Sequence, residues 1–326
     1  MTNGQIYRKT LTFSLRRLLV DTITLLVVLG LGTLGFFIMD RATNMGLIGL
    51  GIGVVLGIIV AAIIGHFYSY KLKAGQIAMM TYGVTEGHLP DNVYQEGKKI
   101  VKERFLTVAA YFAVTNVIKG IFRQIGRGIT RLGNAIGGDT GSAIGSAVSA
   151  AIETLVAYLC DCCLGWVFYR KEKGSVKATL EGAALFFKHG KTLARNAGRI
   201  FGMGLASLAL IGGAFFGIAY LIFSNLPTTF ARLAAEVAEA AARAETEIPE
   251  FLTQPGNLAL VAAALVGIVI WSFLHSTFIR PFVLTGVLRN YLESGMAEAP
   301  DESSFAELER MSPKFAEARR KLGEQA

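Results

Sequence analysis

The chain has 326 residues, of which 52% are hydrophobic and 17% are charged, and its mean hydropathy is +0.48. Soluble globular proteins carry about 25% charged residues, and here the apolar residues form uncharged runs long enough to cross a hydrocarbon core of about 30 Å. The composition excludes a soluble globular protein. It predicts an all-α, polytopic transmembrane helical bundle of about six spans, with interfacial amphipathic helices.

In chain order, a basic segment precedes the first apolar run and a polar tail follows the last one. The first run is long and lacks a small-residue cleavage site, so we expect an uncleaved span rather than a signal peptide. The prediction is a cytoplasmic segment at 1–19, a membrane domain at 20–289 with spans at about 20–39, 45–68, 105–123, 142–169, 200–223 and 258–278, a polar extracytoplasmic segment at 224–257, and a cytoplasmic tail at 290–326.

Polar stretches between and after the spans predict turns and surface helices. Residues 40–44 predict a tight turn, and Gly87-His88-Leu89-Pro90 predicts another. Helices with one apolar and one polar face are expected in the membrane interface or in the tail. Their ranges are 91–104, 117–137, 226–244 and about 305–322.

The distribution of basic residues orients the spans. Segment 1–19 has four Lys and Arg, segment 69–105 has six and segment 170–200 has eight, whereas segment 224–257 has two beside five acidic residues. Basic loops stay in the cytoplasm. We therefore expect both termini in the cytoplasm, in a plasma or bacterial inner membrane. The formal net charge of +8 is explained by these loops, so no nucleic acid partner is expected.

A basic stripe follows the predicted third span. Lys119, Arg123, Arg127 and Arg131 recur every four residues and therefore lie on one helical face. One interpretation is an interfacial helix whose side chains reach lipid phosphates, which makes Arg123, Arg127 and Arg131 contacts for anionic lipids. The other is a basic lining for an anion path. The sequence leaves the side of the membrane open.

Small residues recur at a spacing of four in two predicted spans. This spacing places them on one helical face, where another helix can approach closely. They are Gly49, Gly53, Gly57, Ala61 and Gly65 in the second span, and Gly141, Gly145 and Ser149 in the fourth. The pattern fits packing within the chain as well as an interface between copies of the chain.

Two acidic residues fall inside the predicted fourth span. Glu153 lies mid-span and Asp161 two turns later, and ionisable groups at membrane depth are costly and point to a function. Lys119, Arg123 and Arg280 are candidate partners. A structural ion pair is one interpretation. The other is cation binding or proton relay along a substrate path that includes Glu153, Asp161, Lys119 and Arg280.

No motif indicates catalysis, a cofactor or a metal. Cys160, Cys162 and Cys163 share one predicted helix, and zinc sites with such ligands normally use CxxC pairs from two places. We interpret them as buried apolar thiols, and His66 and His275 as packed or interfacial side chains. Nucleotide-binding glycine loops and hydrolase motifs are missing from the sequence, so an enzyme is not expected.

The order of features from residue 55 onward resembles the C-terminal half of the choline transporter-like family. The resemblance rests on an aromatic-rich span end, a Leu-Pro segment, a basic helix, a cysteine-clustered helix and an R-N-x-x-R segment before a span. The corresponding stretches are 62–70, 89–90 with 98–105, 119–131, 160–163, and 184–187 with 193–200. That family's large ectodomain and first four spans have no counterpart here, so the resemblance implies a related six-helix unit.

Two functions follow as hypotheses. The first is a transporter or channel-like protein for a small solute, a quaternary amine being one candidate. The second is a non-catalytic membrane scaffold or assembly subunit that forms oligomers or tethers a membrane partner through its small-residue helix faces. Both hypotheses place the chain in a lipid bilayer that contains anionic lipids.

Overall fold

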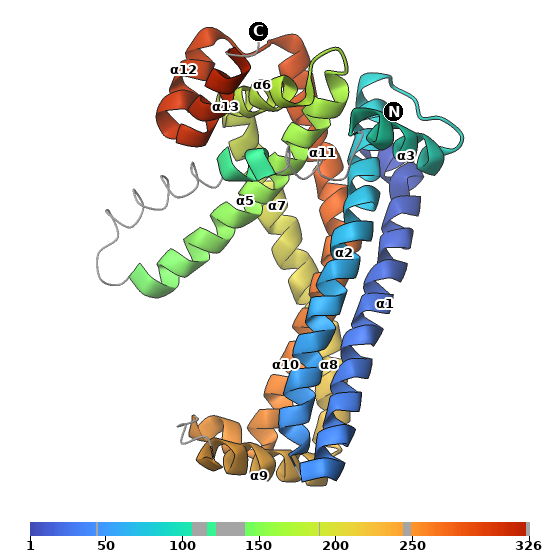
Figure 1. Cartoon of the computed structure of the whole chain (residues 1–326), viewed down its shortest axis with the longest axis vertical. Helices are drawn as coiled ribbons and strands as arrows, with labels where there is room; N and C mark the ends of the chain where they lie inside the picture. Colours follow the sequence, from blue (N-terminus) through green and yellow to red (C-terminus); the bar gives the residue numbers. More distant parts are fainter. Residues whose placement is uncertain (44, 106–115, 122–140, 189, 244–248, 324–326) are drawn as a thin grey trace. The chain divides into compact units, whose positions relative to one another are not determined.

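The computed structural model describes residues 1–43, 45–105, 116–121, 141–188, 190–243 and 249–323 (Figure 1). Every regular element in these residues is helical. The chain divides into two compact units. Unit 1 comprises Met1–Arg17, Ser69–Phe201 and Arg280–Ala326, and unit 2 comprises Leu18–Tyr68 and Gly202–Ile279.

Four helical stretches are long and apolar enough to cross a membrane. They lie in α1 (Asn3–Thr43), in α2 (Gly46–Thr85), in α7 (Gly190–Ser207) with the π-helix η2 (Leu208–Gly212) and α8 (Gly213–Ser224), and in α10 (Pro255–Leu274) with the π-helix η4 (His275–Ile279) and α11 (Arg280–Ala297). The chain is therefore a multi-pass membrane protein. These stretches contain the predicted spans 20–39, 200–223 and 258–278 and nearly all of the predicted span 45–68.

The helix ends differ from the predicted ones near both spans of the N-terminal hairpin. The predicted turn at 40–44 is placed too early, because α1 continues to Thr43 and α2 begins at Gly46. α2 also continues beyond the predicted end at Tyr68, as far as Thr85. Lys71 and Lys73 are polar but are good helix formers, so polarity alone does not end the helix there.

The other two predicted spans are not among these four. Most of 105–123 lies outside the described residues. The span at 142–169 corresponds to α5 (Gly141–Tyr169), which packs against α6 (Ser175–Lys188) and α11 in unit 1. Leu164, Trp166 and Val167 of α5 are at most 2% exposed. The C-terminal part of α5 is thus surrounded by protein.

In unit 2, glycines bring α1 and α2 close together. A Cβ atom on Gly49 or Gly53 would overlap the carbonyl oxygen of Gly35 or Leu31, and one on Gly57 would lie 2.7 Å from the Cα of Val28. This face of α2 is therefore used within the chain. Gly65 has open space around it, and the surroundings of Gly141 and Gly145 lie outside the described residues.

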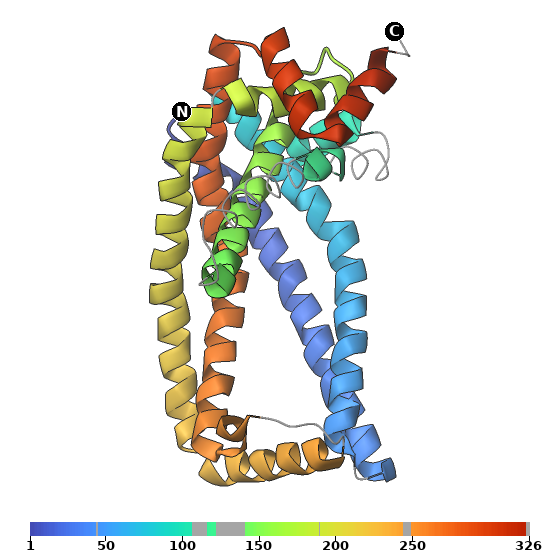
Figure 2. The same ribbon diagram turned by 90° about the vertical axis from the view of Figure 1, so that its left-hand side faces the viewer.

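A second helix pair in unit 2 uses the same kind of contact. α8 and α10 run side by side, and α9 (Pro227–Arg243) lies across their ends (Figure 2). Ala259, Ala263 and Gly267 form the buried stripe of α10. A Cβ on Gly267 would lie 2.7 Å from the carbonyl oxygen of Gly212. α9 occupies most of the predicted helix 226–244, and η3 (Glu250–Thr253) follows it.

Unit 1 contains several shorter helices. α3 (Val93–Arg104) begins after Asn92, whose side chain accepts a hydrogen bond from the Gln95 amide, and Gly87 in the preceding turn has a φ of 72°. The predicted helix at 305–322 is two helices, α12 (Glu302–Met311) and α13 (Pro313–Gly323). Pro313 explains the break, because its ring excludes a helical hydrogen bond and restricts Ser312.

The two units differ in how many large hydrophobic side chains they expose. Apart from Leu15, Val176, Met296 and Met311, the large hydrophobic side chains that are exposed among the described residues belong to unit 2. Unit 1 instead buries its large side chains, including Trp166. Since extensive exposed apolar surface is unusual in soluble proteins, unit 2 has the surface of a membrane-embedded bundle.

Candidate functional site

A buried carboxylate of unit 1 lies between two cations. Lys73 Nζ lies 2.6 Å from Asp161 Oδ1, and Arg280 Nη2 donates to Asp161 Oδ2 at 2.8 Å. Arg280 Nη2 also donates to the carbonyl oxygen of Ala157 at 3.4 Å, and its guanidinium carbon lies 5.5 Å from the centre of the Tyr158 ring. We call Lys73, Asp161 and Arg280 the ion-pair cluster.

Three helices supply one residue each to the ion-pair cluster. Lys73 belongs to the part of α2 beyond the apolar run, Asp161 to the buried part of α5, and Arg280 is the first residue of α11. η4 precedes Arg280 directly, and a π-helical turn changes the direction in which the following side chains point. The cluster therefore ties α2, α5 and α11 together.

The exposure of the three side chains is unequal. The Asp161 side chain is 5% exposed, whereas those of Lys73 and Arg280 are 33% and 28% exposed. A buried carboxylate is tolerated only with charged or hydrogen-bonded partners, and here both of its oxygens have one. With one negative and two positive charges, the cluster has a net positive charge. The nearby Arg17 guanidinium adds a further positive charge that repels the Lys73 ammonium.

A second buried carboxylate joins α5 to α6. The Glu181 side chain is 10% exposed; it accepts a hydrogen bond from Trp166 Nε1 at 3.3 Å and pairs with Lys173 Nζ at 2.8 Å and Arg170 Nη1 at 3.3 Å. The Tyr291 hydroxyl donates to the carbonyl oxygen of Gly182 next to it. These contacts hold the core of unit 1, so we assign Glu181 a structural role.

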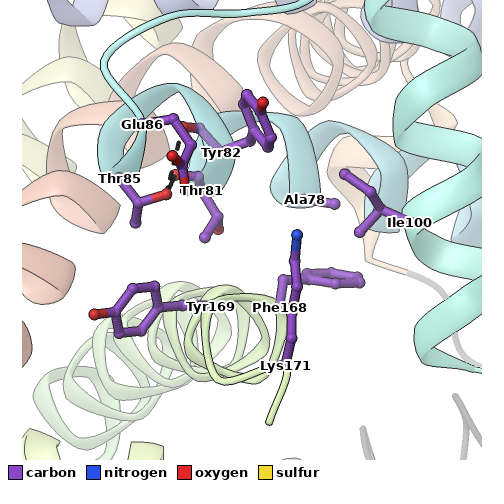
Figure 3. A pocket seen from close by; sticks show the side chains of 9 residues that line it. All are labelled: Ala78, Thr81, Tyr82, Thr85, Glu86, Ile100, Phe168, Tyr169 and Lys171. Atoms are coloured by element: carbon purple, nitrogen blue, oxygen red, sulfur yellow. Dashed lines mark hydrogen bonds between the residues drawn. The ribbon is translucent and has the colours of Figure 1, made fainter.

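A small pocket lies between α2, α3 and the end of α5. Its volume is about 110 Å³, and its lining includes aromatic, hydroxyl and charged side chains (Figure 3). Lys171 reaches into the middle of the pocket, and its Nζ lies 6.0 Å from the centre of the Tyr82 ring. The Thr81 hydroxyl oxygen is buried and has no hydrogen-bond partner among the described residues.

The predicted site residues are only partly brought together. Asp161 and Arg280 are in direct contact, as described above. Glu153 is exposed on α5, and Lys119 is exposed in the short helix at 116–121. Lys119 nevertheless interacts electrostatically with Cys160, the residue before Asp161. The other predicted lipid contacts, Arg123, Arg127 and Arg131, lie outside the described residues.

Two of the three cysteines and His275 pack against neighbouring side chains or backbone, whereas Cys160 is partly exposed. Cys162 and Cys163 are buried, and Cys163 Sγ donates to the carbonyl oxygen of Thr179. His275 Nδ1 lies 3.0 Å from the Ser207 hydroxyl, which also accepts a hydrogen bond from Trp271 Nε1. Within the described ranges, no group of three or more His, Cys, Asp and Glu side chains could hold a metal ion.

Sequence reasoning missed Lys73 and Glu181. Lys73 was assigned to a polar loop, because the predicted second span ended at Tyr68. The apolar stretch Ile77–Met80, which begins four residues after Lys73, is the available signal that the helix continues. Glu181 lies in segment 170–200, which the sequence analysis uses only for its number of basic residues. Its pairing with Trp166 depends on how α5 and α6 pack, which no local pattern encodes.

The helices and their packing define the class of protein, and comparison with known proteins identifies no relative. It is a multi-pass helical membrane protein with a second, protein-packed helical unit. No protein-family model matches the chain, and neither a curated protein nor a solved structure is similar to it.

Proposed function

We propose that this chain is a non-catalytic membrane scaffold whose unit 2 anchors unit 1 at the cytoplasmic face of a plasma or bacterial inner membrane. The observation that supports it most is the distribution of charge. Asp, Glu, Lys and Arg are all missing from four long stretches of the sequence, 22–39, 42–70, 200–231 and 251–279. Transport paths are usually marked by intramembrane ionisable residues, and these stretches offer only His66 and His275.

A four-span arrangement agrees with the basic loops. With spans in α1, α2, α7–α8 and α10–α11, the segment 69–199 lies in the cytoplasm together with both termini. α9 then lies on the other side of the membrane. The three segments of unit 1 then share one side of the membrane, which is what a compact unit requires. Basic segments 69–105 and 170–200 remain cytoplasmic, as the positive-inside rule expects.

Anionic lipids fit the ends of these spans. Lys73 follows the stretch 42–70 by three residues, Arg280 directly follows 251–279, and Arg199 directly precedes 200–231. Basic side chains just cytoplasmic of a span interact favourably with anionic headgroups. We infer that the partly exposed cations of the ion-pair cluster lie at headgroup depth, where Asp161 holds them in place.

Transport of a small solute is the competing proposal. It would use Glu153 and Asp161 as polar contacts, and the resemblance to choline transporter-like proteins makes a quaternary amine the first solute to test. Asp161 is already engaged by two cations, so it offers no free negative charge to a cationic solute. This weakens the transport proposal relative to the scaffold.

Two measurements on the purified chain distinguish the two proposals: the mass of the particle in detergent and the solute flux into proteoliposomes. A scaffold extracted in mild detergent should form a stoichiometric complex larger than one 35.0 kDa chain, either with a partner or with further copies. It should also give no flux above that of empty vesicles in proteoliposomes. A lone chain with saturable uptake that Glu153→Gln abolishes would refute the scaffold.

Topology provides an independent test. Single cysteines replacing Lys171 and Glu236, in a background without Cys160, Cys162 and Cys163, should differ in their reaction with a membrane-impermeant thiol reagent. In intact cells the cysteine at Glu236 in α9 should react, and the one at Lys171 should react only after permeabilisation. Reaction of both in intact cells would contradict a cytoplasmic unit 1.

A further inference from the structure

The ion-pair cluster has more hydrogen-bond donors than Asp161 uses. A guanidinium group carries five N–H donors and an ammonium group carries three. Among the described residues, Arg280 donates through Nη2 alone, to Asp161 and to the carbonyl oxygen of Ala157, and the Lys73 ammonium pairs with Asp161 alone. The Nε and Nη1 groups of Arg280 and the remaining N–H groups of Lys73 are therefore available to another acceptor.

These donors reach the surface of unit 1. The side chains of Lys73 and Arg280 are 33% and 28% exposed, whereas that of Asp161 is 5% exposed. No nitrogen of Lys73 or Arg280 is among the buried polar atoms that lack a hydrogen-bond partner in the described part of the chain. Asp161 thus holds the two cations from the inside, and a further acceptor can approach them from the outside.

The charges around Lys73 favour an anion as that acceptor. The charged groups that act on it most strongly belong to Asp161, Arg280 and Arg17, and of these only Asp161 is negative. Within the cluster, the two cations and the single carboxylate leave one net positive charge. A group with one negative charge would complement it.

The position of the cluster makes a lipid phosphate the available anion. Lys73 follows the uncharged stretch 42–70 by three residues, and Arg280 directly follows the stretch 251–279. With unit 1 on the cytoplasmic side, as proposed above, both cations lie where the headgroups begin. A phosphate has several oxygens on one atom, as a carboxylate does, so it can bridge the same two cations that Asp161 bridges.

The net charge also distinguishes between headgroups. A phosphate linked to glycerol gives a headgroup with a single negative charge, which matches the cluster. A phosphate linked to choline or ethanolamine brings its own cation, which the charges of Lys73, Arg280 and Arg17 would repel. A headgroup without a cation is therefore the better ligand.

We propose that Lys73 and Arg280 bind the phosphate of one anionic phospholipid, of the class whose headgroup carries no cation. Arg280 donates to the phosphate through Nε and Nη1, and the Lys73 ammonium donates through its remaining N–H groups. Asp161 is a positioning residue that keeps both cations in place. The proposal rests on the cytoplasmic position of unit 1 in the proposed function, and it adds one specifically bound lipid per chain to the general attraction of basic span ends.

Native mass spectrometry of the full chain in detergent counts the bound lipids and tests the proposal. Phosphatidylglycerol should give a first bound molecule at least about tenfold tighter than phosphatidylcholine with the same acyl chains. Further copies of phosphatidylglycerol should bind as weakly as phosphatidylcholine. Inorganic phosphate in large excess should leave the first lipid bound, because it lacks the acyl chains.

Variants locate the site and supply a matched control. Lys73→Met and Arg280→Met should each weaken the first phosphatidylglycerol about tenfold. Lys71→Met removes the same charge two residues away, at an exposed position outside the cluster, and should change the affinity less than about twofold. Lys73→Arg and Arg280→Lys keep Asp161 paired and should lose less than the Met variants. Unchanged Trp166 fluorescence verifies that each variant is folded.

Three results would overturn the proposal. The first is phosphatidylcholine binding as tightly as phosphatidylglycerol, and the second is inorganic phosphate displacing phosphatidylglycerol at equal concentration. The third is an equal loss in Lys71→Met and Lys73→Met, which would indicate a general attraction by the basic span end.

Failure of the scaffold is seen separately, because particle mass and flux decide it. A lone chain with saturable uptake that still binds one phosphatidylglycerol through Lys73 and Arg280 would refute the scaffold and retain the lipid site. A stoichiometric complex without flux, in which Lys71→Met and Lys73→Met lose phosphatidylglycerol equally, would retain the scaffold and refute the lipid site.

Discussion

Removing charges from the ion-pair cluster should destabilise unit 1 unequally, depending on which charge is removed. Asp161 is 5% exposed, whereas Lys73 and Arg280 are about one-third exposed. In Asp161→Asn the two cations lose a partner but can turn toward water or headgroups. In Lys73→Met with Arg280→Met the carboxylate is left buried with no cation beside it. The double variant should therefore be the less stable of the two.

The magnitudes follow from the contacts. Asp161→Asn loses charge-assisted hydrogen bonds, which are worth about 1.5–3 kcal/mol each in buried sites, and re-solvation of the cations reduces the total to about 1–3 kcal/mol. In Lys73→Met with Arg280→Met, leaving the buried carboxylate without a cation should lower the free energy of unfolding by about 3–5 kcal/mol. Replacing all three groups by apolar residues, Asp161→Val with Lys73→Met and Arg280→Met, should return to within about 1–2 kcal/mol of the native chain.

Trp166 provides the readout, because it is fully buried on α5 and the chain has only one other tryptophan. Equilibrium unfolding in detergent is followed by fluorescence in a Trp271→Phe background. Lys321→Met is the matched control, since it breaks an exposed pair with Glu317 on α13 and should cost less than about 1 kcal/mol. Equal losses for all the variants, or no recovery in the apolar triple variant, would refute a buried structural cluster.

Two further predictions concern helix contacts. Gly53→Ala should lower the thermal midpoint of the folded chain, because its Cβ would overlap the Leu31 carbonyl oxygen, while Gly65→Ala in open space should leave it equal or higher; the reverse order would contradict the observed α1–α2 contact. At the start of α12, hydrogen bonds from Ser304 hold the pKa of the Asp301 carboxyl below its usual value. Because the folded-state pKa is the lower one, this stabilisation is present above about pH 4 and is lost as the pH falls below it. The protection factors of the α12 amides, which are the exchange rates of an unstructured peptide at each pH divided by the observed rates, should fall on acidification, and Asp301→Ala should remove that pH dependence; an identical fall in the variant would contradict it.

The sequence located one half of the ion-pair cluster and could not locate the other half. Asp161 stood out because ionisable residues are rare inside an apolar span, and Arg280 was a candidate partner for it two residues after the predicted sixth span. Lys73 did not, since a lysine after a span usually marks a loop, and only the continuation of α2 brings it to Asp161. Glu153 satisfied the same sequence criterion as Asp161 and is exposed. The difference is set by how α5 is rotated against its neighbours, which depends on tertiary packing.

The number of spans shows why apolar length alone is an incomplete criterion. An apolar helix can be surrounded by lipid or by protein, and both environments favour the same residue types. The charge content distinguishes them here, because the stretches that could cross a membrane contain long segments without any Asp, Glu, Lys or Arg, whereas α5 carries Glu153 and Asp161. A protein neighbour can supply the partner that a buried carboxylate needs, and lipid tails cannot. The burial of Asp161 against Lys73 and Arg280 therefore argues that the C-terminal part of α5 belongs to a protein core and not to a fifth lipid-facing span.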